Sequence, residues 1–269
     1  MIDAVLVSLA VKSLATALIV VVASIAAERG GPFWGGIAVT LPVTAGPAYV
    51  MLALDHPPDF IAASALTSFA SYPATWVFLV SAVKAAPHFS RLATLAVALA
   101  AWAAAALALQ SVAWTASGAA MANVAAYGAA AWLVRRPGDY VHVRRAPAGW
   151  GELAGRAGLV GIFIAGVVTI SGAIGPAATG LGAVFPIAIS SLTVVLHGKL
   201  GGKAVAATMR NAIHAVAGTG AALGVVHLAT FYASVWLSLA LGLGVALAWS
   251  AILAGREIAA RYQGRGVGA

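Results

Sequence analysis

The chain contains no cysteine and very little charge: of its 269 residues, 8% are charged and 62% are hydrophobic. Without cysteine, a disulfide framework, a thiolate metal site and a thiol nucleophile are all excluded. Soluble domains carry about 25% charged residues, so this composition indicates a membrane protein with several spans. The formal net charge of +8 then reflects basic loops that face anionic lipid, and no nucleic-acid partner is expected.

Acidic residues are scarce as well, and all seven fall at the ends of the predicted spans or in loops. A cation site at mid-membrane usually needs a carboxylate, so a bound solute is expected to be anionic or neutral. The histidines His197, His214 and His227 have no carboxylate nearby in the sequence, and no metal-binding spacing such as H-E-x-x-H occurs. We therefore expect no enzyme activity, no metal site and no cofactor.

Long apolar runs dominate what the sequence does contain. A span needs roughly 20 apolar residues, and cutting the chain at its charged, proline and glycine residues gives nine candidates. They lie near residues 3–27, 33–54, 58–83, 89–111, 114–134, 156–174, 177–197, 203–225 and 228–254. The five arginines from Arg135 to Arg156 mark a cytoplasmic loop, which predicts that the N-terminus lies outside and the C-terminus inside.

Glycines, prolines and basic residues recur at a constant offset of 144 residues. The pairs are Lys12 and Arg156, Gly31 and Gly175, Pro32 and Pro176, Gly36 and Gly180, and Pro42 and Pro186. The first span enters from outside and the sixth from inside, so the offset predicts two inverted four-helix repeats joined by a linking helix, as in many secondary transporters. The predicted units are 1–111, a linking helix and basic loop at 112–155, 156–255, and a cytoplasmic tail at 256–269. Chance matching of frequent glycines is the alternative.

Pro42 and Pro186 fall near the middle of the second and seventh spans. A proline lacks the N–H donor of a helix and clashes with the carbonyl four residues earlier, which is that of Gly182 for Pro186. Both helices are therefore expected to kink or break at a depth where unpaired backbone must be buried or line a cavity. Thr40 and Ser190 are candidates to satisfy the freed groups. One such kink usually shapes packing, whereas a matched pair points to a binding site.

An early lysine, an acid–base pair before a proline, a glycine-rich turn and a Leu-Pro pair follow one another between Val11 and Leu52. The residues are Lys12, Glu28, Arg29, Pro32, Gly36, Leu41 and Pro42. In this order they resemble the GlpM-like family of small bacterial inner-membrane proteins, over roughly the first 110 residues. The resemblance implies a four-helix unit in the bacterial inner membrane and a link to alginate production. The second half is a weaker copy that lacks the acid–base pair.

Ionisable groups at membrane depth are costly and usually functional. The first span contains Lys12, and the eighth contains Arg210, Asn211 and His214, of which Arg210 and His214 share a helical face. Two alternatives stay open: Arg210 can snorkel to the cytoplasmic interface, and His214 can be a neutral histidine bonded to a neighbouring helix.

The third span carries hydroxyl groups along one helical face, at Ser64, Thr67, Ser68 and Ser71. These residues are candidates for a binding site, although packing between helices is the more frequent role of small residues in membranes. Most tryptophans, including Trp76, are expected to anchor the protein at the membrane interfaces.

Taken together, the sequence predicts an all-α polytopic membrane protein that works as a secondary transporter of a small anionic or polar organic solute. Alternating access would operate around a site between the second, third, seventh and eighth spans. The alternative, which the family resemblance favours, is a non-transporting scaffold or accessory subunit of envelope polysaccharide biosynthesis. Assembly as a homodimer is left open.

Overall fold

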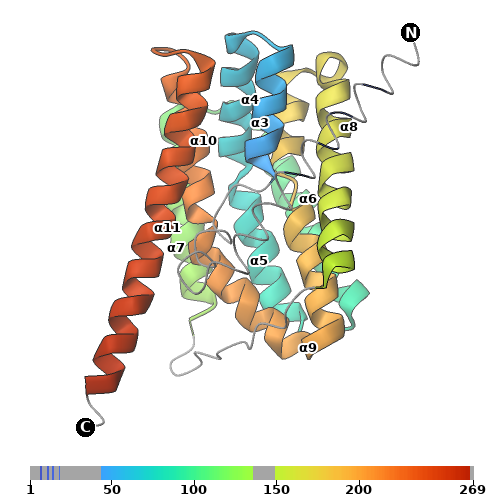
Figure 1. The fold of residues 1–269 in the computed structure, drawn as a ribbon, viewed down its shortest axis with the longest axis vertical. Coiled ribbons are helices and arrows are strands. Elements are labelled where there is room, and N and C mark those ends of the chain that lie inside the picture. The colour runs from blue at the N-terminus through green and yellow to red at the C-terminus, as the bar shows by residue number, and fades with distance from the viewer. Residues whose placement is uncertain are drawn as a thin grey trace.

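The computed structural model describes residues 44–135 and 149–266, together with Val7, Val11, Leu14 and Leu18, which are helical and exposed. Every regular element within those ranges is a helix, which confirms the all-α class. The helices are α3 (Ala45–Asp55), α4 (Pro58–Ser71), α5 (Pro73–Ala85), α6 (Arg91–Gln110), α7 (Ala116–Leu133), α8 (Trp150–Ala183), α9 (Ile187–Ala215), α10 (Ala217–Ala229) and α11 (Val235–Gly266). They pack into one bundle, and α11 extends beyond it towards the C-terminus (Figure 1).

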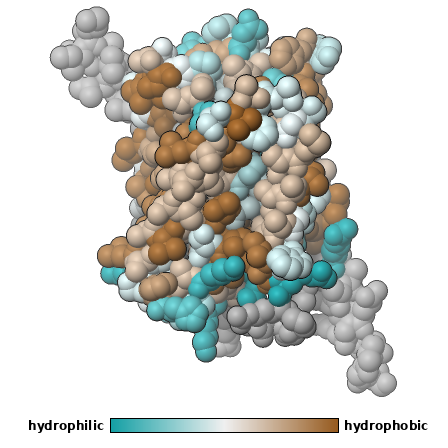
Figure 2. Space-filling view, turned by 180° about the vertical axis from the view of Figure 1, so that it is seen from behind, coloured by the Kyte–Doolittle hydropathy of each residue, from teal (hydrophilic) through white to brown (hydrophobic). Residues whose placement is uncertain are grey.

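Several of these helices are suited to a membrane. Five stretches in the described part are long and apolar enough to cross one: Pro58–Ala85, Arg91–Gln110, Trp150–Ala183, Ile187–Ala229 and Val235–Arg256. Figure 2 shows hydrophilic residues gathered towards the two ends of the bundle and a largely apolar surface between them. The expectation of membrane-spanning helices is therefore confirmed. The count of nine spans stays a prediction, because much of 1–43 and 136–148 lies outside the described ranges and α7 is not among the five stretches.

Two glycines reverse the direction of the chain. Gly175 has φ 74° and ψ 173°, and Gly201 has φ 77° and ψ 173°, a backbone region that essentially only glycine adopts. After Gly175 the chain returns along α8, so that a Cβ on Gly182 would lie 3.0 Å from Cγ1 of Val167. The segment from 176 to 200 therefore runs antiparallel to the first part of α8 (Figure 1).

That antiparallel segment is broken at its middle. α8 ends at Ala183 and α9 begins at Ile187, with Pro186 before it in a non-helical conformation (φ −78°, ψ 45°). Because Pro186 has no N–H for the carbonyl of Gly182, this carbonyl instead accepts the N–H of Phe185 at 3.1 Å. The interruption predicted at Pro186 is thus confirmed.

Another proline, Pro73, lies where α4 meets α5. It leaves the carbonyl of Phe69 without its helical donor, yet Tyr72 keeps helical angles (φ −60°, ψ −30°). The Phe69 carbonyl accepts the Tyr72 N–H at 3.3 Å and the side-chain amide of Asn123 at 2.7 Å. The two helices therefore continue as one apolar stretch of 28 residues.

The α4–α5 stretch crosses residues 202–229 in antiparallel fashion. The hydroxyl of Tyr72 donates to the carbonyl of Val216 at 2.8 Å, and Nε1 of Trp76 donates to the carbonyl of Ile213 at 3.2 Å. Trp76 is only 3% exposed, so the expectation that it anchors at the membrane interface is wrong: its indole joins two helices inside the bundle. α10 begins and ends 144 residues after α5, and α11 begins 144 residues after α6.

Candidate functional site: a groove at the broken helix

A groove of about 500 Å³ opens beside the break, between α6, α8 and α9. Its walls are mostly apolar, with Leu95 and Leu99 on α6, Leu159 on α8, and Val194 and Val195 on α9. Of the residues proposed from sequence, Ser190 lines this groove directly. Gly182 and Pro186 flank the break itself, in the last turn of α8 and before the first turn of α9.

One end of the groove carries unsatisfied polar groups at the break. Ser190 is 6% exposed, and its hydroxyl has no hydrogen-bond partner among the described residues. The N-terminus of α9 has no side-chain cap, because Pro186 occupies the capping position. In this first turn the N–H of Ile187 donates to the carbonyl of Phe185 at 2.8 Å and that of Ser190 to the carbonyl of Pro186 at 2.8 Å. At most the N–H groups of Ala188 and Ile189 are then left for an anion or another acceptor. The neighbouring Ser191 differs, since its hydroxyl donates to the carbonyl of Ala188 at 2.8 Å.

The opposite end of the groove is cationic. Arg156 lines it from α8, and Glu152, one turn earlier, is paired with Lys199 of α9. Arg91 is close by, because a Cβ on Gly198 would meet its Nη1 at 3.5 Å. These four charged side chains carry three positive charges and one negative, so this end of the groove favours an anion.

Three aromatic rings pack together at the break. Phe185, between α8 and α9, lies edge-on to Trp102 of α6 at 5.0 Å between centroids, and against Phe163 of α8 at 5.1 Å. Such contacts add to the burial of the rings. Trp102 is 7% exposed, so these rings pack inside the bundle, and Phe185 also lines the groove.

The hydroxyl face of α4 packs against α8 and does not line the groove. A Cβ on Gly180 would lie 2.3 Å from the carbonyl oxygen of Ser64 and 3.0 Å from Cβ of Thr67, so the two backbones approach closely. Ser68 donates to the carbonyl of Gly180 at 2.6 Å and contacts the hydroxyl of Tyr49 at 2.7 Å. Most of the stripe therefore takes the packing role that was its alternative.

The remaining members of that stripe are also engaged locally. Ser71 accepts a hydrogen bond from Nε2 of Gln110 at 3.1 Å, and Thr67 donates to the carbonyl of Ala63 at 3.2 Å. Only the buried hydroxyl of Ser64 has no partner among the described residues.

Arg210, Asn211 and His214 lie apart from the groove, on the part of α9 that follows Gly201. Arg210 is half-buried, and its Nε is buried without a hydrogen-bond partner in the described part of the chain. Asn211 is exposed. Nδ1 of His214 lies 2.8 Å from the hydroxyl of Tyr127 on α7, which is the alternative of a histidine bonded to a neighbouring helix.

Three other candidates, Lys12, Thr40 and Pro42, lie outside the described residues. The predicted approach of Pro42 to Pro186 therefore stays a prediction. Within the described ranges, no group of three or more His, Asp or Glu side chains is placed to hold a metal ion.

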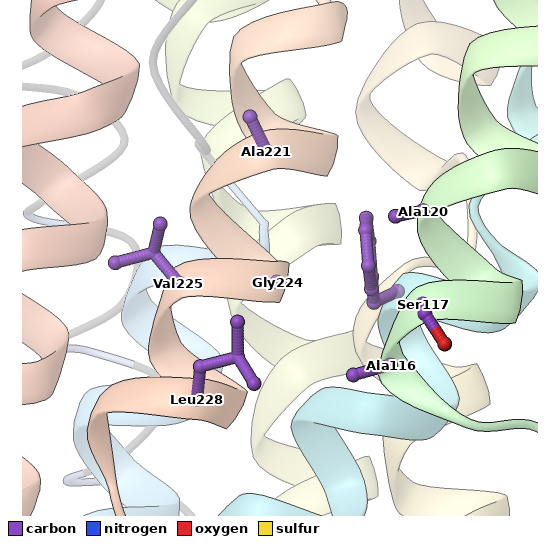
Figure 3. Close-up of a pocket in the computed structure, with 8 residues that line it drawn as sticks. Ala116, Ser117, Ala120, Ala221, Gly224, Val225 and Leu228 are labelled. Carbon is purple, nitrogen blue, oxygen red and sulfur yellow. The ribbon is translucent and has the colours of Figure 1, made fainter. Parts of the chain in front are cut away.

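A second groove, of about 590 Å³, lies between α7 and α10. Figure 3 shows Ala116, Ser117 and Ala120 on one wall and Ala221, Gly224, Val225 and Leu228 on the other. Its one hydroxyl, on Ser117, is exposed and already 3.2 Å from that of Thr115. Because no buried polar side chain lines this groove in the part of the chain that the structure describes, it is a weaker candidate for binding a polar solute.

The sequence analysis did not name two residues whose roles the structure shows. Arg156, which lines the groove, was used as a loop charge that sets orientation and as the repeat counterpart of Lys12, but not as a candidate binding residue. Asn123, the single amide in the predicted fifth span, donates to Phe69 and holds the Pro73 joint. A lone amide in an apolar helix was the available signal.

No protein-family model, no curated protein and no solved structure matches the chain. The resemblance to the GlpM-like family therefore stays a prediction, and most residues on which it rests precede Thr44, outside the described ranges.

Proposed function

We propose that this protein is a membrane carrier for a small anionic or polar organic solute, with its binding site in the groove at the Pro186 break. The observation that carries the proposal is the combination of a helix interrupted inside the bundle with a buried hydroxyl, on Ser190, that has no partner within the described chain. Interrupted helices with free N-termini are the usual substrate sites of secondary transporters.

The charge of the groove supports an anion as the solute. Arg156 lines the groove, and no carboxylate other than Glu152 does so within the described chain. Glu152 is paired with Lys199, and this end of the groove keeps a net positive charge. A polar solute would satisfy the N-terminus of α9 and the hydroxyl of Ser190 together.

The spacing of the helices supports two inverted repeats, which we include in the proposal. The segments 58–85 and 202–229 are 144 residues apart, each is interrupted near its middle, and they cross antiparallel. The hydroxyl of Tyr72 meets the carbonyl of Val216, 144 residues later. Contact between equivalent positions is what a two-fold axis in the membrane plane requires, and rocking about such an axis gives alternating access.

We assign Arg210 to the same carrier, as a second charged group rather than as part of the groove. It lies on the 202–229 segment, between the reversal at Gly201 and the crossing at Val216. A guanidinium with a buried, unpartnered Nε in the described part of the chain is costly unless it serves binding or reaches the interface.

The direct test is counterflow of labelled organic anions by the purified protein in liposomes. We expect uptake that saturates, that exceeds the rate of empty liposomes, and that falls when Arg156 is replaced by Gln. If the folded protein transports none of a broad panel of anions, the carrier function is contradicted and the alternative of a non-transporting scaffold is favoured.

A second assay reports the orientation of each loop by labelling single introduced cysteines in whole cells. The chain has no cysteine of its own, so the protein contributes no background labelling.

A further inference from the structure

We propose that the groove between α6, α8 and α9 binds an acidic phospholipid, with one acyl chain along its apolar walls and the phosphate at Arg91. Lipid binding does not depend on the proposed carrier function. Its consequence for transport does, because a lipid chain and a solute would compete for the same space. The inference comes from where the groove opens, what lines it and which charge stands at its end.

The groove lies on the outside of the bundle, where the bilayer borders it. α6 and the first part of α8 belong to stretches that are long and apolar enough to cross a membrane. Leu159 of α8 lines the groove and is 47% exposed, and the lining residues Leu95 and Leu99 of α6 are half-buried. The hydrocarbon core of a bilayer contains no water, so lipid chains are the molecules that reach these side chains.

The walls of the groove suit an acyl chain. Most of the side chains that line it are apolar, among them Leu95, Leu99, Leu159, Ile187, Val194 and Val195. Of the two serines in the wall, Ser191 is bonded to its own helix and Ser190 has a buried hydroxyl. Packing against such walls favours methylene groups over polar groups, which would lose their hydrogen bonds. Any lipid chain meets this condition, so selection between lipids depends on the charged end.

The groove has the length of one leaflet. It begins at the break, where Ile187 starts α9, and it reaches Glu152, which is paired with Lys199 near the other end of that helical segment. About eleven residues of α9 separate Ile187 from Gly198, which is roughly 16 Å of helix. The hydrocarbon core of a bilayer is about 30 Å thick. One acyl chain, from the middle of the bilayer to its interface, therefore fits along the groove.

Arg91 stands at the interfacial end of the groove. It precedes Leu95 and Leu99 in steps of four residues, so it lies on the face of α6 that lines the groove. A Cβ on Gly198 of α9 would lie 3.5 Å from Nη1 of Arg91, so the guanidinium extends from α6 across to α9. Arg91 is exposed, and a guanidinium can donate two parallel hydrogen bonds to a phosphate.

The other charges at this end are mostly positive. Lys84 of α5 and Lys199 of α9 are exposed. The two helices are joined there, since Nε2 of His197 lies 3.3 Å from the carbonyl oxygen of Ala86. Glu152 is paired with Lys199, so positive charge remains in excess. The sequence predicts that this end is cytoplasmic, and basic pockets between membrane helices on that side suit acidic headgroups.

The test places the full-length protein in phosphatidylcholine nanodiscs with a trace of a photoreactive lipid. The probe is phosphatidylglycerol with a diazirine in one acyl chain, and the control is phosphatidylcholine with the same chain. Peptide mass spectrometry then gives the ratio of label in the groove to label on the exposed face of α11, which includes Leu237 and Leu241. We expect this ratio to be about fivefold higher for phosphatidylglycerol, the effect of about one basic residue near the membrane surface.

The headgroup is tested with two arginine variants. Arg91→Gln should remove most of the preference for phosphatidylglycerol, because the guanidinium at the end of the groove is lost. Arg256→Gln is the control, since Arg256 is an exposed arginine of α11 towards the same end of the bundle (Figure 1), and it should keep the preference. Both substitutions replace exposed side chains, and thermal melts check that both variants fold.

The acyl chain is tested with two variants of α6. Leu99→Trp fills the groove and should lower its labelling by both lipids about threefold or more. Val97→Trp is the control, because Val97 is 43% exposed on the same helix and does not line the groove. If Leu99→Trp fails to fold, the arginine variants still decide the proposal.

Several results would overturn the inference. Equal ratios for the two probes, a preference that survives Arg91→Gln, or label spread evenly over the exposed helices would each reject an acidic-lipid site in the groove. If phosphatidylglycerol labels the groove as expected but no anion shows counterflow in liposomes, the carrier function fails and the lipid site stands. Counterflow of an anion together with equal ratios for the two probes gives the converse: the carrier stands and the lipid site fails.

Discussion

Pro73 and Pro186 interrupt two helices of the same bundle by the same chemistry, with different outcomes. In both cases the carbonyl four residues earlier loses its helical donor and accepts the N–H of the residue before the proline. The distances are 3.3 Å from Tyr72 N to the Phe69 oxygen and 3.1 Å from Phe185 N to the Gly182 oxygen.

The difference lies in what the neighbouring helices supply. At Pro73 the backbone stays helical, and Asn123 of α7 adds a second donor to the Phe69 carbonyl. At Pro186 the chain leaves the helical region for three residues, and a groove opens there beside Ser190, whose hydroxyl has no partner within residues 44–135 and 149–266. The two breaks therefore differ in whether a neighbouring helix supplies a second donor to the freed carbonyl, as Asn123 does at Pro73.

The largest expected effect concerns the short helix that precedes the Pro186 break. Gly180→Ala would place a Cβ 2.3 Å from the carbonyl oxygen of Ser64, and neither backbone can yield easily. We expect a loss of about 3 kcal/mol in the free energy of unfolding, seen as a lowered melting temperature in detergent. Gly166→Ala, in the part of α8 before the Gly175 reversal, where a Cβ meets nothing within 4 Å, is the control and should melt like the parent. Equal stability of the two variants would contradict the close approach of α4 and α8.

Arg210 tests whether the functional site is confined to the Pro186 break. Arg210→Lys keeps the charge but loses the planar fork of five donors. We expect transport to fall by about tenfold or more, as loss of a charge-assisted hydrogen bond implies, while folded yield stays near that of the parent. Unchanged transport in both Arg210→Lys and Arg210→Gln would show that the arginine only reaches the interface, and would leave the groove as the sole site of the proposal.

The break at Pro73 can be tested through the Phe69 carbonyl, which Asn123 and the backbone share. Asn123→Ala removes one donor from the Phe69 carbonyl and should cost about 1 to 2 kcal/mol of stability. Pro73→Ala restores the backbone N–H that this carbonyl lacks. In a double-mutant cycle we expect the Asn123→Ala loss to shrink when Pro73→Ala is present, with a coupling of about 0.5 to 1 kcal/mol. If the melting-temperature shifts of Asn123→Ala and Pro73→Ala simply add in the double variant, the two residues do not act on the same Phe69 carbonyl.

The smallest expected effect compares two buried serines. Ser190→Ala removes a hydroxyl without a partner in the described chain, so stability should change by less than about 0.5 kcal/mol or rise slightly. Ser68→Ala removes the contacts to Gly180 and Tyr49 and should cost about 1 to 2 kcal/mol. Thermal melts of the two variants side by side decide this. A larger loss for Ser190→Ala than for Ser68→Ala would assign Ser190 a structural role.

The parts of this molecule that follow from local chemistry were predicted from sequence. The apolar runs predicted the helical segments, and the missing N–H of Pro186 predicted the break in the helix. The break at Pro73 was not predicted. Its counterpart at the 144-residue offset is Ala217, so a search for prolines repeated in both halves does not find it.

The sequence did not show which helices pack against one another. The hydroxyl face of α4 looks the same whether it faces a cavity or another backbone, and only the position of Gly180 opposite Ser64 decides between them. For the same reason Arg156 was assigned to a loop: nothing local to it reveals that α6 and α9 enclose it in a groove.

The contact between Ser68 and Gly180 also bears on how the chain enters the membrane during synthesis. The helix that follows Gly175 is too short to cross a bilayer alone, and its carbonyl at Gly180 is satisfied by a serine from α4, made more than a hundred residues earlier. An unpaired carbonyl in lipid is strongly disfavoured, so this short helix gains its place only against an α4 that is already inserted. We therefore expect the N-terminal half to act as the template on which the C-terminal half completes its insertion.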